Sequence, residues 1–389
     1  MARILIGWEF GANRGHAVRL AALAEALRAQ GHETVFALQR IDALAPAEAG
    51  GSAIWQAPVT PRLLVTARRS LGRAPAGMAD ILARLGFDDP AIVAAMIGGW
   101  RRLLEAVRPD AVIGDFAPFL MLAARGSAPT LLVGTGFTAP PAGMAAFPNL
   151  VAGVEGVDQK ALLTAVNAGL AAAGAAPLAA LPQIFAADRP LAADFAEIDP
   201  YADARAEPLL DPLPRGFGAS AADGEEVFVY APETVGADAP LWRGLAEAKL
   251  PTRVHVPRAP ASLREAVARL GFTFEPEPVP FARIARRSRL LVSHGGHGFL
   301  CAGLAAGLPQ VVCHYDLEKL LNGLAVARLG VGGHVPLASI EPNAFATSLV
   351  RLHRDDGLAS RARAAAARFR RNGQRPLRDA VLEAVAALA

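Results

Sequence analysis

Short apolar runs alternate with amphipathic stretches from the first residues of the chain. Residues 4–7 form an apolar run typical of a buried strand, and residues 18–30 repeat leucine at the spacing of one helix face. Gly31 marks the end of that helix, and a second apolar run follows at 34–38. The pattern predicts a βαβ unit, with a glycine-containing loop over residues 8–15 between the first strand and the helix.

The same alternation recurs through most of the chain. A strand predicted at 110–115 ends in an acidic residue, and a helix at 118–125 and a strand at 130–134 follow it. A second series begins at residue 226. Its predicted strands are 226–230, 252–256, 272–274, 289–293 and 310–314, and its predicted helices are 241–248, 262–270 and 299–306. Strands that alternate with helices favour parallel sheets covered on both faces, so the expected fold class is α/β.

The composition changes between the two series. Residues 206–224 are rich in proline, aspartate, glycine and alanine, as is typical of a linker. We therefore expect an N-terminal domain over 1–205 and a C-terminal domain over 225–370. Residues 371–389 are expected to form a helix that packs back on the N-terminal domain. A chain of 389 residues is long enough for two such cores.

Composition and charge exclude several classes of protein. With 53% hydrophobic and 19% charged residues, the chain has the composition of an ordinary globular protein and not of a disordered one. A net charge of +3, without a Lys/Arg run interleaved with aromatic residues, gives no indication of nucleic-acid binding. The two cysteines, Cys301 and Cys313, lie in apolar runs, so we expect both to be reduced core residues.

The sequence lacks the pattern of a membrane span. The most apolar stretch, 161–187, is interrupted by Asn167, Gly174, Pro177 and Pro182, so it falls short of the ~20 continuous apolar residues that a span needs. The first strand begins at once and leaves no room for a signal peptide. We therefore expect a cytoplasmic protein.

The strongest candidate site is the turn that follows the strand predicted at 289–293. Its residues are Ser293, His294, Gly295, Gly296, His297 and Gly298, and a helix begins by Leu300. Backbone N–H groups and a helix N-terminus that meet at one point form a site for an anion such as phosphate. Any parallel α/β protein needs glycine in such turns. The two imidazoles favour the phosphate interpretation, because histidine can donate to an anionic oxygen.

The segment around this turn resembles the donor-binding signature of family 1 glycosyltransferases of the GT-B fold. That group includes bacterial macrolide and antibiotic glycosyltransferases, plant glucosyltransferases and glucuronosyltransferases. Their pattern is an apolar strand, His-Gly-Gly-x-Gly, a helix, Gly-x-Pro, a strand and Asp-Gln-x-x-Asn. The chain follows it in the same order with residues 294–298, 307–309, 318–322 and 329–332. The resemblance covers most of the chain and implies two Rossmann-like doubly wound domains that face each other across a cleft.

The resemblance implies that the C-terminal domain binds a nucleotide-diphosphate sugar, with UDP- and TDP-sugars as the expected donors. His294 would contact the pyrophosphate, Phe281 would lie where the group holds the nucleobase, and the pair Glu318 and Lys319 would reach the sugar hydroxyls. The implied donor-binding residues are Phe281, His294, Gly295, Gly296, His297, Gly298, Glu318, Lys319 and Asn322.

Three positions depart from the pattern of the group. Phe299 stands where a serine or threonine often contacts phosphate, and Ala302 stands where an acid usually binds the ribose hydroxyls. Lys319 replaces a glutamine beside Glu318, which suits either a donor sugar that carries a carboxylate or a plain surface salt bridge. These departures leave the donor nucleotide and the donor sugar open.

A second candidate site consists of His16 and Asp115. His16 ends the first predicted loop, and Asp115 ends the strand predicted at 110–115. In the resembled family a histidine here is the general base that deprotonates the acceptor, and an acid after a later strand orients it. A hydroxyl is a weak nucleophile that needs a base, and a carboxylate fixes the tautomer of that base. Either residue could instead cap a helix.

The expected activity is the inverting transfer of a sugar to a hydroxyl of a small, hydrophobic acceptor. Residues 55–100 are expected to line the acceptor half of the cleft. Their apolar members include Met78, Leu82 and Met96, and their arginines include Arg62, Arg68, Arg69 and Arg73. These arginines suit an anionic acceptor group, a membrane surface or a solvated helix face.

No metal or other cofactor is expected, because no Asp-x-Asp stands at the end of a predicted strand. Two other functions fit the same fold. One is a nucleotide-sugar epimerase, and the other is a pseudoenzyme that binds a nucleotide sugar and supports a partner.

Overall fold

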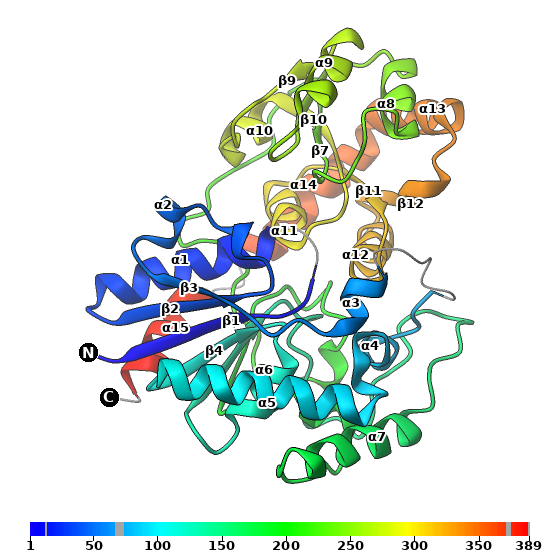
Figure 1. The fold of residues 1–389 in the computed structure, drawn as a ribbon. Helices are drawn as coiled ribbons and strands as arrows, with labels where there is room; N and C mark the ends of the chain where they lie inside the picture. The colour runs from blue at the N-terminus through cyan, green and yellow to red at the C-terminus, as the bar shows by residue number, and fades with distance from the viewer. Residues whose placement is uncertain (12–13, 67–73, 371–374, 388–389) are drawn as a thin grey trace. The chain divides into compact units, whose positions relative to one another are not determined.

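The chain divides into two compact units. We describe a computed structural model of the chain over residues 1–11, 14–66, 74–370 and 375–387. Unit 1 comprises Met1–Leu210 together with Arg375–Ala389, and unit 2 comprises Asp211–Gln374. Each unit contains a six-stranded parallel sheet with helices packed against it (Figure 1).

The sheet of unit 1 has the strand order β3-β2-β1-β4-β5-β6. Its strands are β1 (Arg3–Trp8), β2 (Glu33–Leu38), β3 (Ala53–Gln56), β4 (Ala111–Asp115), β5 (Thr130–Gly134) and β6 (Arg189–Ala192). Its helices are α1 (Gly15–Ala29), α2 (Pro46–Ala49), α3 (Pro61–Thr66), α4 (Met78–Leu82), α5 (Pro90–Val107), α6 (Pro118–Ala124), α7 (Gln159–Ala172) and α15 (Leu377–Ala386). The strand order reverses between β1 and β4, and doubly wound sheets bind ligands beyond the carboxyl ends of the strands at that point.

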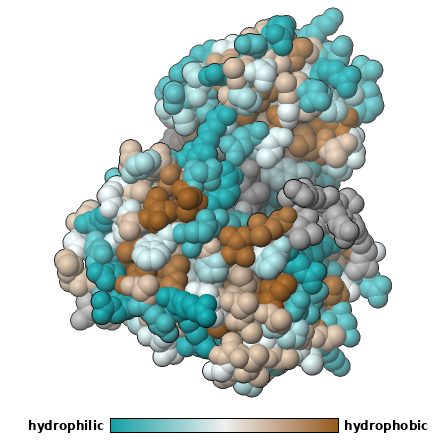
Figure 2. Space-filling view, in the orientation of Figure 1, coloured by the Kyte–Doolittle hydropathy of each residue, from teal (hydrophilic) through white to brown (hydrophobic). Residues whose placement is uncertain are grey.

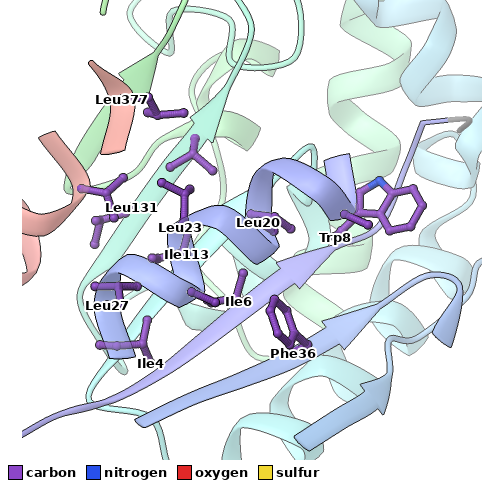
Figure 3. Packing of buried hydrophobic residues seen from close by; sticks show 14 of the residues in the cluster. Ile4, Ile6, Trp8, Leu20, Leu23, Leu27, Phe36, Ile113, Leu131 and Leu377 are labelled. Atoms are coloured by element: carbon purple, nitrogen blue, oxygen red, sulfur yellow. The ribbon is translucent and has the colours of Figure 1, made fainter. Parts of the chain in front are cut away.

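A buried apolar cluster lies between this sheet and the helices α1 and α15 (Figure 3). Ile4 and Ile6 of β1 and Leu20 of α1 are fully buried in it. Val381 of α15 belongs to the same cluster and is also fully buried. The last helix of the chain therefore completes the core of the unit that contains the first strand.

The sheet of unit 2 repeats the topology of unit 1, with the order β12-β11-β10-β7-β8-β9. Its strands are β7 (Glu226–Tyr230), β8 (Thr252–His255), β9 (Thr273–Phe274), β10 (Ser288–Ser293), β11 (Gln310–His314) and β12 (Gly332–Pro336). Its helices are α8 (Pro240–Glu247), α9 (Ala261–Arg269), α10 (Phe281–Arg287), α11 (His297–Ala306), α12 (Leu317–Arg328), α13 (Pro342–His353) and α14 (Asp356–Arg370). Here the strand order reverses between β7 and β10, directly before the glycine-rich turn.

The α/β fold class predicted from the sequence is confirmed, with two doubly wound sheets. The strands that the pattern did not predict are β3, β6 and β12. All three lie at the edges of the sheets and are partly exposed, so they lack a continuous apolar run. Helix α1 begins at Gly15, three residues earlier than predicted, which places His16 inside the helix.

The division between the units falls within the proline-rich segment 206–224. Ala219 in its second half is buried against unit 2, where Phe217 packs as well, so this part of the segment belongs to unit 2. Cys301 and Cys313 are free and buried, as expected.

Among the described residues, no helix combines the length and the apolar character needed to cross a membrane. On the face seen in Figure 2, apolar residues occur in small separate groups among polar ones.

Candidate functional site

The carboxyl ends of β1 and β4 bring together His16 and Asp115, the candidate site in unit 1. The two strands pair in parallel, and the last residue of each is opposite the other, Trp8 beside Asp115. His16 is the second residue of α1, which begins a few residues after β1. The base and the acid therefore meet because two adjacent parallel strands end at the same edge of one sheet.

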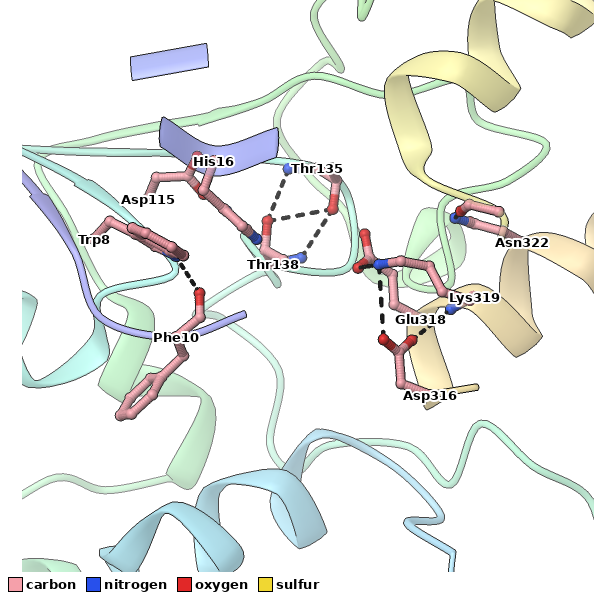
Figure 4. Close-up of polar contacts among 11 residues, drawn as sticks. Trp8, Phe10, His16, Asp115, Thr135, Thr138, Asp316, Glu318, Lys319 and Asn322 are labelled. Carbon is pink, nitrogen blue, oxygen red and sulfur yellow. Dashed lines mark hydrogen bonds and ion pairs between the residues drawn. The ribbon is translucent and has the colours of Figure 1, made fainter. Parts of the chain in front are cut away.

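His16 and Asp115 form a hydrogen-bonded pair (Figure 4). Nδ1 of His16 lies 2.9 Å from Oδ1 of Asp115, and Nη1 of Arg19 donates to Oδ2 of the same carboxylate at 3.0 Å. Asp115 is fully buried, which opposes its ionisation, but the charges and hydrogen bonds of His16 and Arg19 outweigh burial and lower its pKa. Asp115 is thus an ionised carboxylate that fixes one ring nitrogen of His16.

Aromatic side chains hold the ring of His16 in place. The indole of Trp8 stacks on it with a centroid distance of 5.7 Å, and the ring of Phe116 stacks at 6.4 Å. The side chain of His16 is 11% exposed. Because Nδ1 is bonded to Asp115, Nε2 is the nitrogen that remains for another molecule.

Gly11 lies against Nε2 of His16. A β-carbon at Gly11 would lie 2.4 Å from Nε2, which is closer than any real contact, and the backbone of Gly11 has φ +104. Both facts require glycine at this position. A residue of any other type would place a side chain against Nε2 of His16.

Gly11→Ala is therefore expected to lower kcat at least about tenfold, because the methyl group displaces the imidazole and the backbone conformation is strained. Gly15→Ala is the matched control, since a β-carbon at Gly15 meets no atom within 4 Å. We expect this control to keep kcat within about twofold. Steady-state kinetics of both variants measure these effects. An equal loss of kcat in Gly11→Ala and Gly15→Ala would contradict a specific requirement for glycine at position 11.

The candidate site in unit 2 is the glycine-rich turn between β10 and α11. Gly295 has φ +82, and a β-carbon there would lie 2.6 Å from Cγ1 of Val312, so this position also requires glycine. The N–H of Gly295 donates to Oγ of Ser293 at 3.1 Å, and Nδ2 of Asn322 donates to the carbonyl of Gly295 at 2.9 Å. Asn322 thus ties α12 to the turn. The N-cap of α11 is Gly296, which has no side chain to cover the first N–H groups of the helix.

His294 is a neutral imidazole at the base of this turn. It is 7% exposed, and burial together with the nearby charge of Lys319 lowers its pKa to about 4. Its Nδ1 is buried without a hydrogen-bond partner among the described residues. The ring of Tyr315 stacks on it at a centroid distance of 6.1 Å. A buried nitrogen without a partner is costly, which is consistent with a place for a ligand atom.

Glu318 and Lys319 form a buried ion pair and not the surface salt bridge considered from the sequence. Nζ of Lys319 contacts Oε2 of Glu318 and lies 3.9 Å from Oδ2 of Asp316 (Figure 4). The side chains of Lys319 and Glu318 are 11% and 13% exposed. Burial opposes the charge on Lys319, but the two carboxylates outweigh burial and raise its pKa. The ammonium of Lys319 is therefore already matched by two acids.

Phe281 and Phe299 belong to an aromatic cluster beside the turn. Their rings meet edge to face at 5.5 Å, and the ring of Tyr230 stacks on Phe299 at 5.1 Å. Ala302, one turn further along α11, is 7% exposed. Two of the three positions that depart from the resembled pattern are thus occupied by apolar side chains, and Phe299 is held by its aromatic neighbours.

The structure brings His16 and Asp115 together in unit 1. In unit 2, the donor-site residues predicted from the sequence lie on the turn or on the elements that begin or end beside it: Phe281, His294, Gly295, Gly296, His297, Gly298, Glu318, Lys319 and Asn322. Arg19, Gly11 and Tyr315 also lie at these sites and were not predicted from the sequence. Arg19 follows His16 by three positions, a spacing that places both on one face of α1. This spacing is the one sequence signal that would have identified Arg19.

The region expected to line the acceptor half contains both exposed and buried apolar side chains. Trp55 and Leu64 are 45% and 70% exposed. Met78, Leu82 and Met96 are at most 4% exposed and belong to the core. Arg62 forms an exposed ion pair with Asp88. Arg68, Arg69 and Arg73 lie outside the described residues.

Solved structures of glycosyltransferases match the chain over its full length. One is the calicheamicin glycosyltransferase CalG4, with 18% identity, coverage of 100% of this chain and 98% of that chain, and a TM-score of 0.67. Another is SnogD from Streptomyces nogalater, with 19% identity, coverage of 99% of each chain and a TM-score of 0.58. The spinosyn rhamnosyltransferase SpnG complexed with thymidine diphosphate also matches, with 18% identity, coverage of 98% of this chain and 99% of that chain, and a TM-score of 0.63. The chain has the GT-B fold. Comparison with protein-family models and with curated protein sequences finds no match.

Proposed function

We propose that this GT-B protein is an inverting glycosyltransferase that moves a sugar from a nucleotide-diphosphate sugar to a hydroxyl of a small, hydrophobic acceptor. The observation that carries the proposal is the pair of His16 and Asp115 at the switch point of unit 1. The glycine-rich turn at the switch point of unit 2 and the full-length likeness to glycosyltransferase structures support it.

In the proposed reaction, Nε2 of His16 takes the proton of the acceptor hydroxyl as its oxygen attacks the anomeric carbon. Asp115 holds the proton on Nδ1 and stabilises the imidazolium as it forms. The bond between the anomeric carbon and the phosphate oxygen breaks, and the nucleotide diphosphate leaves with the electron pair. Attack on the face opposite the leaving group inverts the anomeric configuration.

The leaving diphosphate would be stabilised by the turn of unit 2. The N-terminus of α11 carries roughly half a positive charge from the helix dipole, and the N–H groups of its first turn are not covered by a cap. Nδ1 of His294, which has no partner among the described residues, would add a side-chain donor when it carries the single proton of the neutral ring. We propose UDP- or TDP-sugars as donors, and the structure of SpnG with thymidine diphosphate supports the second. No metal enters this proposal.

Donor binding is expected to be nearly independent of pH between 5.5 and 8, because a histidine with a pKa of about 4 is neutral throughout this range. Calorimetric titration with UDP-glucose and TDP-glucose at several pH values measures this. An affinity that rises about tenfold towards pH 5.5 would show that an imidazolium binds the phosphates. His294→Gln keeps a neutral donor and is expected to retain more affinity than His294→Ala.

The buried ion pair favours a donor sugar without a carboxylate. Lys319 has two acidic neighbours, so a third carboxylate would meet Glu318 and Asp316 as well as the ammonium. We expect kcat/KM for a glucose donor to exceed that for the matching glucuronate donor at least about tenfold. A higher kcat/KM for the glucuronate donor in the wild type, together with the loss of this preference in Lys319→Gln, would mean that Lys319 binds a uronate.

The acceptor is the least defined substrate. SpnG has been solved with spinosyn aglycone, which supports the proposal of a small-molecule aglycone as the acceptor.

A panel of UDP-, TDP- and GDP-sugars with mixed hydroxylated acceptors tests the proposal. Acceptor-dependent release of nucleoside diphosphate, with a glycosylated product of inverted configuration, supports it. Binding of nucleotide sugars without turnover would instead favour a pseudoenzyme, an outcome consistent with Phe299 and Ala302 in place of polar residues. Interconversion of the sugar without an acceptor would favour an epimerase.

A further inference from the structure

Glu9 is a buried acid that the proposed reaction does not use. It follows β1 directly, between Trp8 and Phe10, and it is 1% exposed. Its Oε2 accepts from the N–H of Phe119 at 3.0 Å, and its Oε1 accepts from the N–H of Leu120 at 2.6 Å. These two N–H groups belong to the first turn of α6.

Helix α6 has no cap of its own. Its N-cap is Ala117, whose side chain cannot accept a hydrogen bond. The first N–H groups of a helix lack partners within the helix and need acceptors when they are buried. Glu9 supplies these acceptors, although it precedes Phe119 by 110 positions in the sequence. The start of α6 therefore depends on the segment after β1.

The turn between β4 and α6 needs such an external hold. Phe116 has φ 46, a left-handed conformation that a residue with a β-carbon adopts only when its surroundings impose it. The N–H of Phe10 donates to the carbonyl of Phe116 at 3.2 Å, next to the bonds of Glu9. This turn begins with Asp115, and the ring of Phe116 stacks on His16. Glu9 and Phe10 therefore fix the turn that carries two of the neighbours of His16.

We propose that Glu9 is a positioning residue for the glycosyl transfer, which holds the turn at Asp115 and Phe116 in the conformation that orients His16. The proposal rests on the function proposed above. Glu9 acts through the backbone of α6 and touches neither substrate.

The two oxygens of Glu9 each accept from one backbone N–H, which decides how a substitution acts. Burial raises the pKa of Glu9 to about 8, against the opposing effect of the two backbone hydrogen bonds. In Glu9→Gln the amide oxygen can still accept one of the two bonds, but the NH₂ group can only donate, so the other bond is lost. In Glu9→Ala both bonds are lost.

The test compares Glu9→Gln and Glu9→Ala with Asp188→Asn. Asp188 also accepts from a distant backbone N–H, that of Thr130 at 2.8 Å, but at the start of β5 and away from the candidate site. We expect Glu9→Ala to lower kcat about tenfold or more, with KM values within about twofold. Glu9→Gln, which can keep one of the two bonds, should have a kcat between those of Glu9→Ala and the wild type. Asp188→Asn should leave kcat within about twofold.

A proton NMR spectrum provides a readout that does not depend on activity. The proton between Nδ1 of His16 and Asp115 is expected to give a low-field resonance in the wild type and in Asp188→Asn, and to shift or broaden in Glu9→Ala. An unchanged resonance and unchanged kcat in Glu9→Ala would overturn the proposal. If Glu9→Ala does not fold, a kcat of Glu9→Gln that falls only in step with its Tm overturns it as well. If no transfer is found with any substrate, the resonance still tests the positioning role, so failure of the function and failure of the inference are distinguished.

Discussion

Replacing His16 by alanine is expected to lower kcat by about 10² to 10⁴, the range that general base catalysis contributes to such reactions. Donor affinity is expected to stay within about twofold, because His294 and the turn of unit 2 are unchanged. Steady-state kinetics with an acceptor and calorimetry with the donor measure the two effects separately. The expected pattern is therefore a loss of turnover without a loss of donor binding.

Added imidazole offers a sharper test of the same variant. The alanine leaves a space between Trp8 and Phe116, whose rings stack on His16 in the wild type. Free imidazole in that space should restore part of kcat in a concentration-dependent way. His32→Ala, which changes the histidine that follows α1 at its far end, is the control and should keep full activity. A His16→Ala protein with kcat within tenfold of the wild type would remove His16 from the reaction.

Replacing Asp115 by asparagine is expected to lower kcat by at least about 10²-fold. The amide cannot balance the charge of the imidazolium, and its NH₂ group can donate to Nδ1 and so favour the tautomer with the proton on Nε2. The general base would then present a proton where it needs a lone pair. The loss should appear in kcat more than in KM for either substrate, as for His16→Ala.

Arg19→Gln serves as the control for Asp115→Asn. Arg19 donates to the other oxygen of the carboxylate, so its loss weakens the support of Asp115 but keeps the bond to His16. We expect a decrease in kcat of about tenfold or less. Asp115→Asn with an activity equal to that of Arg19→Gln would mean that the carboxylate acts only as a structural partner.

Because the pKa of Asp115 is lowered, the stability that its ionised form contributes should be lost only as the pH falls below the usual range of a carboxyl group.

The fold and the main features of both sites were predictable from local signals. Apolar runs that alternate with helical patterns predicted most of the parallel strands, and the glycine-rich turn after 289–293 indicated an anion site without further context. His16 and Asp115 lie 99 positions apart, and the prediction that they form a pair depends on the resemblance to a known family. The resemblance to a known family supplied their roles.

Other features of the sites depend on contacts that no local pattern records. Glu9 is a single acid between two aromatic residues in the sequence, and only the packing of β1 beside β4 brings it to α6. The two carboxylates around the ammonium of Lys319 come from the fold of α12 and not from a sequence motif. The sequence predicts that Phe299 lacks a phosphate-binding hydroxyl, and the structure adds that its ring packs in an aromatic cluster.

The place of α15 has a consequence for the order in which the chain can fold. The ribosome releases the residues of unit 2 before those of α15, yet Val381 and Leu377 are part of the core of unit 1. Unit 2 is thus an insertion within unit 1, and during synthesis it can finish folding while unit 1 still exposes the apolar surface that α15 covers. The part of the protein that is made first is completed last, and a fragment that stops at residue 370 would keep the whole glycine-rich turn but lack a finished core around His16.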